Sequence, residues 1–362
     1  MGSAAGKNVD TSGGGDGSGG SYKRRAYHAG SWYENGPSQL DATLLGYLNE
    51  AQKDREQTPN DNNNSLLRAV IVPHAGYRFS GPTAAYSYHA LQQALSNPSS
   101  PIQHIVVLHP SHHVYLQNCA VSGATVLETP LGDLPVAEDL RQEILALNNR
   151  KTSKENLFTI MDASTDNEEH SGEMQYPYLA KLLLQSKQPR HKPQISVLPI
   201  MCGALSTSQE ESFGQLLAPI LARPEIVCVI SSDFCHWGSR FRFTPTASDR
   251  SGGASTTTAS MPIHEFISQM DHHGMDLIAA LKPGAFADYL QQTRNTICGR
   301  HAIAVWLQAM TAPHHNDSNT SQAPSLSVNF VKYAQSSAIQ SMDDSSVSYA
   351  SAVVTAAPTS KP

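Results

Sequence analysis

The sequence has no surplus of positive charge. Its 362 residues include 25 lysines and arginines against 31 aspartates and glutamates, which gives a formal net charge of −6 and a pI near 6.2. A protein that binds nucleic acid or an anionic membrane surface through charge needs a basic face. Nucleic acid is therefore not an expected partner.

Cysteine is scarce, and its spacing is not that of a cross-linked or zinc-stabilised fold. The five cysteines are odd in number and widely spaced, and no two of them form a CxxC pair. Disulfide frameworks and structural zinc sites use even sets or close pairs of cysteines. The sequence also lacks a leading apolar segment like that of a signal peptide, and it has no run of about 18 apolar residues. We expect a protein of the cytoplasm, with the nucleus as a second location, and no membrane span.

Composition predicts one large domain between two tails. Apolar runs extend through most of the chain without an internal linker, whereas the start is dominated by glycine and serine, which cannot bury enough surface to become ordered. The predicted parts are a disordered tail at 1–22, a single α/β domain at 23–356 with polar insertions near 57–65, 247–260 and 312–325, and a disordered C-terminus at 357–362.

Buried-type strands alternate with helical patterns along this domain. Short apolar runs predict strands, and apolar residues at helical spacing predict helices between them. The expected strands are at 69–73, 105–108, 195–200, 226–230, 327–333 and 347–354, and the expected helices are at 38–51, 82–95, 136–148, 173–186, 262–281, 284–293 and from about 301 to 310. Pro82 is expected at the first position of its helix. The pattern predicts an α/β fold with a central, largely parallel or mixed sheet flanked by helices.

Polar side chains follow three of the predicted interior strands. His74 comes just after the first strand, His112 just after the second, and Asp233 and His236 just after the run at 226–230. In open α/β sheets ligands bind beyond the carboxyl ends of the strands, so these side chains are expected to meet at one edge. Two histidines so placed form a plausible pair of ligands for a first-row transition metal, although each also fits an ordinary loop histidine. His236 would then act as acid or base, with Asp233 as its orienter or as a further ligand. The alternative is helix capping by Asp233 and a surface position for His236.

Cys298 precedes the last predicted helix. Backbone amides and the helix dipole at such a position are expected to lower the pKa of a thiol, which would make Cys298 a ligand or a nucleophile. The alternative is a small buried apolar residue, the usual role of a free cysteine. Glu169 and His170 lie in an acidic loop that either forms a pocket wall or is simply exposed.

Several separate segments, in order, resemble the Memo family. The matching segments are 28–33 (HAGSWY), 73–77 (PHAGY), 110–113 (PSHH), 169–174 (EHSGEM), 231–238 (SSDFCHWG), 295–301 (NTICGRH), 333–337 (YAQSS) and 344–349 (DSSVSY). The resemblance covers nearly all of residues 24–356 and is absent only from the glycine-rich tail and the polar insertions.

The resemblance implies a fold similar to that of class III extradiol dioxygenases, which hold non-haem iron with two histidines and one glutamate. Matched by motif, the metal ligands are His74, His112 and Cys298, so that a thiolate stands where those enzymes have a carboxylate. A soft thiolate favours copper, zinc or a differently tuned iron, which argues against ring cleavage. The cofactor expected is copper or iron. The residues expected around the pocket are Trp32, Tyr77, His113, Glu169, His170 and Arg242.

Three functions remain open at this point. The first, implied by the resemblance, is a copper- or iron-binding redox and signalling protein linked to cell motility or invasive growth, with copper-dependent production of superoxide. The second is a binding module for phosphotyrosine peptides or a signalling protein that uses the same pocket without a metal. The third is a non-haem iron dioxygenase, or a hydrolase, that acts on an unknown small molecule.

Overall fold

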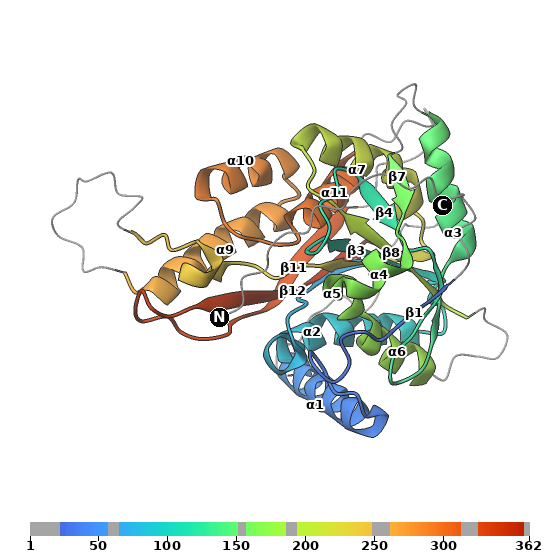
Figure 1. Cartoon of the computed structure of the whole chain (residues 1–362), viewed down its shortest axis with the longest axis horizontal. Coiled ribbons are helices and arrows are strands. Elements are labelled where there is room, and N and C mark those ends of the chain that lie inside the picture. The colour runs from blue at the N-terminus through green and yellow to red at the C-terminus, as the bar shows by residue number, and fades with distance from the viewer. Residues whose placement is uncertain are drawn as a thin grey trace.

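A computed structural model gives the fold of the chain and describes residues 22–56, 65–150, 157–185, 194–247, 261–312 and 325–357. Apart from residues 22 and 357, both predicted tails lie outside these residues, as does the bulk of the three predicted insertions. Tyr22, predicted to lie in the disordered tail, is part of a strand. The α/β class is confirmed, with a central mixed sheet between two layers of helices (Figure 1).

Four parallel strands form the centre of the sheet. They are β2 (Leu66–Val72), β9 (Ile226–Ser231), β3 (His104–Pro110) and β8 (Ser196–Cys202), in that spatial order. Nearly all of their side chains are buried, as expected for continuous apolar runs covered on both faces. Because the four strands are parallel, their carboxyl ends reach the same edge of the sheet.

Antiparallel strands flank this centre and make the sheet mixed. The long strand β12 (Ser346–Ala356) pairs with β2 on one side and with β11 (Leu326–Gln335) on the other. At the opposite side, β4 (Cys119–Val121) runs antiparallel to β8 and parallel to β7 (Phe158–Ile160). The two-residue strand β10 (His236–Trp237) pairs with the start of β12. A separate small sheet contains β1 (Tyr22–Arg24), β5 (Ala124–Leu127) and β6 (Leu134–Pro135).

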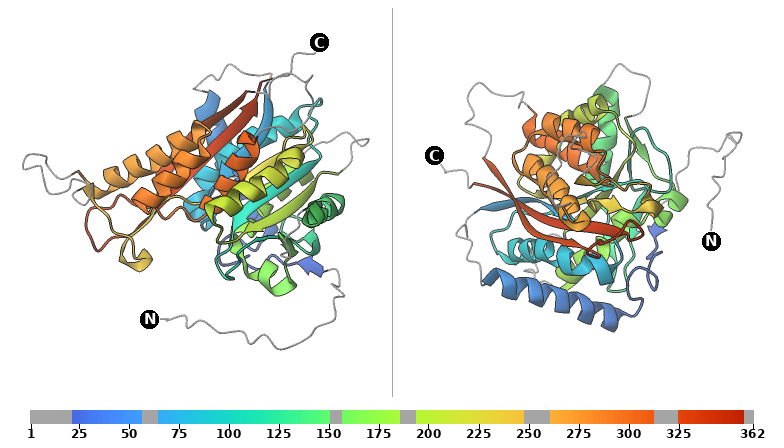
Figure 2. Two further views of the ribbon diagram at one scale, coloured as in Figure 1. Left: turned by 90° about the horizontal axis from the view of Figure 1, so that it is seen from above. Right: turned by 90° about the vertical axis from the view of Figure 1, so that its left-hand side faces the viewer.

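Helices cover both faces of the sheet. On one face lie α1 (Pro37–Glu56), α2 (Tyr77–Ser96) and α6 (Tyr176–Gln185), and on the other lie α7 (Thr207–Leu221) and α11 (Arg300–Thr311). The helix α10 (Pro283–Thr293) packs beside α11, and α9 (Ile263–Ala279) packs on α10 and on β11. The right-hand view of Figure 2 shows β11 and β12 between these two helical layers. No helix in the part of the chain that the structure describes is long and apolar enough to cross a membrane.

Two helices begin at a different residue from the one predicted. The helix predicted from Pro82 begins at Tyr77, so that Pro82 lies inside α2 and leaves the carbonyl of Arg78 without its helical partner. The helix predicted over 173–186 is interrupted: a single turn, α5 (His170–Glu173), precedes α6. The remaining short helices are α3 (Glu138–Ala146) and α4 (Ala163–Glu168). The short strands β1, β4, β5, β6, β7 and β10 were not predicted, because two to four residues carry no usable periodicity.

Gly214 is expected to be indispensable to the packing of α7 on α11. A Cβ at this position would lie 2.3 Å from Cβ of Gln308 and 2.8 Å from the backbone nitrogen of Ala309. Gly214→Ala should therefore lower the free energy of unfolding by about 1–3 kcal/mol. Gly284→Ala in α10 is the matched control, since nothing lies within 4 Å of its added Cβ, and it should be neutral or slightly stabilising. Urea denaturation measures both, and equal effects would contradict this account.

Candidate metal centre

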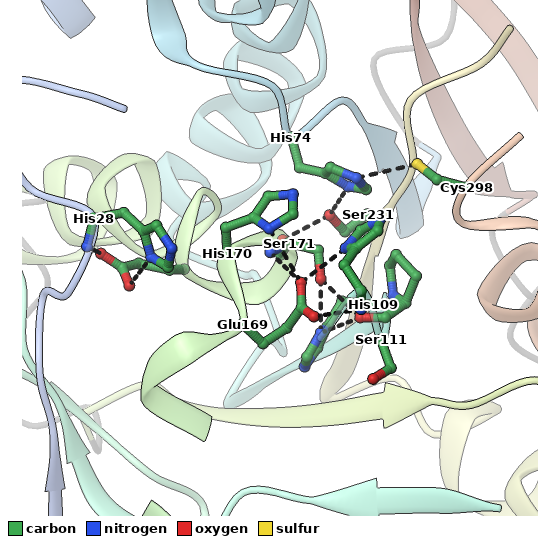
Figure 3. A network of polar contacts seen from close by, with 12 residues as sticks. His28, His74, His109, Ser111, Glu169, His170, Ser171, Ser231 and Cys298 are labelled. Carbon is green, nitrogen blue, oxygen red and sulfur yellow. Dashed lines mark hydrogen bonds and ion pairs between the residues drawn. The ribbon is translucent and has the colours of Figure 1, made fainter. Parts of the chain in front are cut away.

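Three potential metal ligands converge at the carboxyl edge of the parallel strands. His74 follows β2, His112 follows β3, and Cys298 lies two residues before α11. Their ligand atoms all lie within 4.8 Å of one another, and Sγ of Cys298 is 3.1 Å from Nε2 of His74. Figure 3 shows His74 and Cys298 facing each other across this edge. The convergence expected for these side chains is thus present, from three distant parts of the sequence.

The proton on the ring of His74 is assigned by a chain of hydrogen bonds. Nδ1 of His74 lies 2.8 Å from the hydroxyl of Ser231, at the end of β9. That hydroxyl donates its only proton to the carbonyl of Ser171 and accepts another bond from the amide of Gln175. It must therefore accept from His74, so Nδ1 is protonated. Nε2 then carries the lone pair, and it is the nitrogen that faces Cys298.

Glu169 determines in the same way which ring nitrogen of His112 carries the proton. Oε1 of Glu169 lies 2.9 Å from Nδ1 of His112, and the carboxylate also accepts the backbone N–H groups of His112 and Ser171. Burial alone would raise the pKa of Glu169, but the hydrogen bond with His112 holds it well below its usual range. An ionised carboxylate only accepts, so Nδ1 of His112 donates and Nε2 is left free. Both histidines thus have the carboxylate or hydroxyl partner that commonly orients metal-binding imidazoles.

The expected low pKa of Cys298 is wrong. Cys298 does precede a helix, and its sulfur accepts the backbone N–H of Asp233 at 3.3 Å. Burial, however, raises the pKa of the thiol well above its usual value, and the charge of Asp233 raises it further. The helix terminus is outweighed because burial disfavours the charged thiolate more than the nearby backbone N–H groups favour it. As a thiol, Cys298 is placed to donate to Nε2 of His74.

Asp233 and His236 lie beside this cluster. Asp233 is buried, and its carboxylate accepts the backbone N–H of His74 at 2.8 Å. Burial raises the pKa of Asp233 to about 7 in spite of that hydrogen bond. Nδ1 of His236 lies 2.9 Å from the carbonyl of Phe234 and 3.1 Å from that of Thr296, so it is protonated and Nε2 is the free acceptor. Burial lowers the pKa of His236, with a smaller effect from the charge of His112.

Aromatic rings form a wall on the other side of the cluster. The ring of His170 stacks on His112 with centroids 4.5 Å apart and lies against Trp32 at 4.3 Å. His113 meets the same ring edge-on at 6.0 Å. His112, Glu169 and His170 form a second group whose ligand atoms lie within 4.8 Å of one another. The alternative of a simply exposed acidic loop does not hold for Glu169, which is 2% exposed.

The other two predicted pocket residues are Tyr77 and Arg242. Tyr77 is buried, donates its hydroxyl to the carbonyl of Met174 and packs on Tyr33. It borders a surface hollow of about 610 Å³ together with Trp32. Arg242 is exposed, has a left-handed backbone (φ 56°), and follows the short turn Ser239–Phe241, whose Phe241 packs on the ring of His236.

The sequence did not reveal the buried residues that fix the backbone around the cluster. Arg24 and Glu173 form a buried ion pair, with Nη1 of the guanidinium 2.6 Å from Oε2 of the carboxylate. Arg24 also donates to the carbonyls of Asp166 and Glu169, which fixes the turn that presents Glu169. Glu173 further accepts from Tyr33 and from the backbone and ring of His28. Buried charges need such partners, but only the fold shows which residues supply them.

Ser231, Ser171 and Gln175 were also missed as orienting groups. A serine directly after a buried strand was a usable signal for Ser231, since the ends of interior strands in such sheets point into binding sites. Ser171 and Gln175 carried no comparable signal, because they act through a backbone carbonyl and through an amide on an unpredicted turn.

The fold and the cluster define the class of protein: an α/β protein with a His-His-Cys group at the carboxyl edge of its parallel strands. The family profile described as Memo-like protein matches residues 24–353. The chain belongs to the Memo family, and the resemblance read from its motifs is confirmed.

Sequences of related proteins align with almost the whole of this chain. "Protein MEMO1" of Mus musculus and that of Homo sapiens are each 39% identical over 332 residues, which are 92% of this chain and 97% of theirs. "Protein memo-1 homolog" of Caenorhabditis elegans is 38% identical over 335 residues, covering 92% of this chain and 83% of its own. Among solved structures, an uncharacterized Escherichia coli K12 protein aligns with TM-score 0.42 at 12% identity, over 78% of this chain and 99% of that one.

Proposed function

We propose that this Memo protein binds copper or iron through Nε2 of His74, Nε2 of His112 and the sulfur of Cys298. The observation that carries the proposal is the pair of hydrogen bonds from Nδ1, to Ser231 and to Glu169, which leaves both Nε2 atoms free beside one thiol. Two imidazoles with one sulfur are a donor set that suits copper, zinc or iron. The residues present therefore fit a transition metal.

Bound copper or iron would supply one-electron transfer to dioxygen, with superoxide as the product. The protein's own groups would orient the ligands and handle protons. Asp233, with a pKa raised to about 7, can gain or lose a proton near neutral pH. His236 offers Nε2 as an acceptor at the same edge, and the rings of His170 and Trp32 lie along one side of the cluster.

The biological setting belongs to the same proposal. As the family resemblance implies, we place this redox activity in cytoplasmic signalling linked to cell motility or invasive growth. Cys298 argues against ring-cleaving dioxygenase activity, because iron in those enzymes is held by a third, carboxylate ligand rather than by a thiolate.

Removing two of the ligands is expected to abolish metal binding. A His74→Ala, Cys298→Ser double variant should lose the stoichiometric binding of Cu(I) and Fe(II), because one imidazole cannot hold the ion alone. Anaerobic titration followed by elemental analysis measures this, and superoxide detection after exposure to oxygen gives the redox readout. His272→Ala, an exposed histidine on α9, is the control and should bind as the parent does. Undiminished binding in the double variant would overturn the proposal.

Ser231→Ala tests the orienting hydrogen bond. The change removes the hydroxyl that accepts from Nδ1 of His74, so that the ring loses its fixed tautomer. The affinity for Cu(I) should fall by about 10–100-fold, the usual effect of losing such a partner. Ser87→Ala is the matched control: it is also a buried serine, bonded to the carbonyls of Ile71 and Ala352. Equal affinity in the two variants would show that Ser231 does not orient His74.

A metal-independent peptide-binding role is the second candidate, and the hollow beside the cluster favours it. The hollow is bordered by Trp32, Tyr77, Arg78 and Phe79, and the guanidinium of Arg78 lies 4.3 Å from the ring centroid of Phe79. An aromatic surface with an arginine suits a phosphotyrosine side chain.

Calorimetry with a phosphotyrosine peptide in the presence of chelator tests this role. Binding should be saturable and should weaken at least about tenfold in Trp32→Ala, since truncating a central aromatic anchor removes about 2 kcal/mol or more. Tyr115→Ala, which removes an exposed aromatic ring outside the hollow, is the control. Equal affinity of the phosphorylated peptide for Trp32→Ala and for the parent would exclude this surface.

A further inference from the structure

Cys119 and Cys202 face each other across two antiparallel strands. Cys119 begins β4, Cys202 ends β8, and the two residues are direct partners in the register of the ladder. In such a ladder, partner positions alternate between pairs that exchange backbone hydrogen bonds and pairs that do not. The side chains of a non-hydrogen-bonded pair lie closer together than those of a hydrogen-bonded pair.

The neighbouring hydrogen bonds place the cysteines in a pair of the second kind. The N–H of Gly203 donates to the carbonyl of Asn118, one step from the cysteines, and the N–H of Ser122 donates to the carbonyl of Pro199, three steps away. Hydrogen-bonded pairs recur every two positions, so Cys119 and Cys202 form a non-hydrogen-bonded pair. Such pairs have Cα atoms about 4.5 Å apart and side chains on the same side of the sheet. Disulfides join Cα atoms that are about 4.4–6.8 Å apart, so a bond needs no movement of the strands.

We propose that Cys119 and Cys202 form a reversible disulfide when the protein meets a peroxide. One sulfur attacks the peroxide, forming an S–O bond as the O–O bond breaks and one water leaves. The second sulfur then displaces the hydroxyl group as a second water and closes the S–S bond. Two thiols lose two protons and two electrons in total, and the peroxide takes both. A small cellular thiol reverses the step by exchange.

The disulfide would close the base of the loop that carries His112. Residues 111–118 connect β3 to β4, and Cys202 pairs with Pro110 on one side of β8 and with Cys119 on the other. Within the loop, His112 and His113 are exposed, and the backbone is held to the next segment by the N–H of Ala204, which donates to the carbonyl of Leu116. The bond would restrict opening of this loop. Its effect on metal binding rests on the proposed function, but the bond itself does not.

Burial makes the reaction slow and selective. Cys119 is 0% exposed and Cys202 is 2% exposed, and burial raises the pKa of the Cys119 thiol well above its usual value, with a further contribution from its hydrogen bond with Cys202. Both cysteines belong to the main hydrophobic core, so oxidation requires a local opening of the fold that admits the peroxide to the pair. Cys228 is equally buried in β9, but its partners across the strands are Ala69 and Val106, so it has no cysteine to join.

The test uses the full, metal-depleted chain, so that its outcome does not depend on metal binding. Reduced protein is treated with hydrogen peroxide, quenched with catalase, unfolded in an alkylating agent and digested without reductant for mass spectrometry. We expect a peptide pair joined through Cys119 and Cys202, which separates on reduction, while Cys228 is recovered alkylated. Cys119→Ser and Cys202→Ser should each abolish the cross-link. Amide hydrogen exchange of residues 111–118 should slow several-fold on oxidation of the parent and stay unchanged in Cys202→Ser.

Recovery of Cys119 and Cys202 as free thiols or sulfinic acids would overturn the proposal, as would disulfides that join only other cysteines. The parent chain alone decides this outcome, so a variant that fails to fold does not obscure it. Failure of metal binding in the separate titration would leave the cross-link result intact.

Discussion

The buried ion pair between Arg24 and Glu173 is the interaction on which the arrangement of the site depends. It joins the first described strand to the turn α5, two segments 149 positions apart. Through the same guanidinium, the carbonyls of Asp166 and Glu169 are held in place, so the carboxylate that orients His112 has a fixed backbone. An ion pair of this kind adds little net stability, because desolvation offsets the attraction. Its contribution here is to hold the segment from Asp166 to Glu173, which has little regular structure, in a single conformation.

The two histidines of the cluster, His74 and His112, are oriented by opposite kinds of partner. A carboxylate orients His112 and leaves its side chain 27% exposed, whereas a neutral hydroxyl network orients His74, which is 2% exposed. A second carboxylate next to the buried ring would add a desolvated charge, which is expensive in a site already beside Asp233. The serine, glutamine and backbone carbonyl behind His74 fix the tautomer without adding charge. The cluster thus combines a solvent-facing histidine with a buried, firmly oriented one.

Cysteine has three separate roles in this chain, and position decides among them. Cys298 lies among histidines at the edge of the sheet, Cys228 is packed in an interior strand, and Cys119 and Cys202 share a cross-strand pair. The odd count and the wide spacing in the sequence correctly argue against a disulfide framework. They say nothing about one pair brought together by an antiparallel strand of three residues, which is too short to be predicted.

Much of the fold and part of the site could be predicted from the sequence because they depend on local pattern. Apolar runs identified β2, β3, β8 and β9. Because parallel strands end at one edge of the sheet, the positions of His74 and His112 just after such strands were enough to predict that the two side chains meet. Other features depend on tertiary structure. The pKa of Cys298 was predicted in the wrong direction because a helix start is visible in sequence whereas burial is not. The partners of Arg24, the tautomers of both histidines and the pairing of Cys119 with Cys202 each join residues far apart along the chain, so only the folded arrangement decided them.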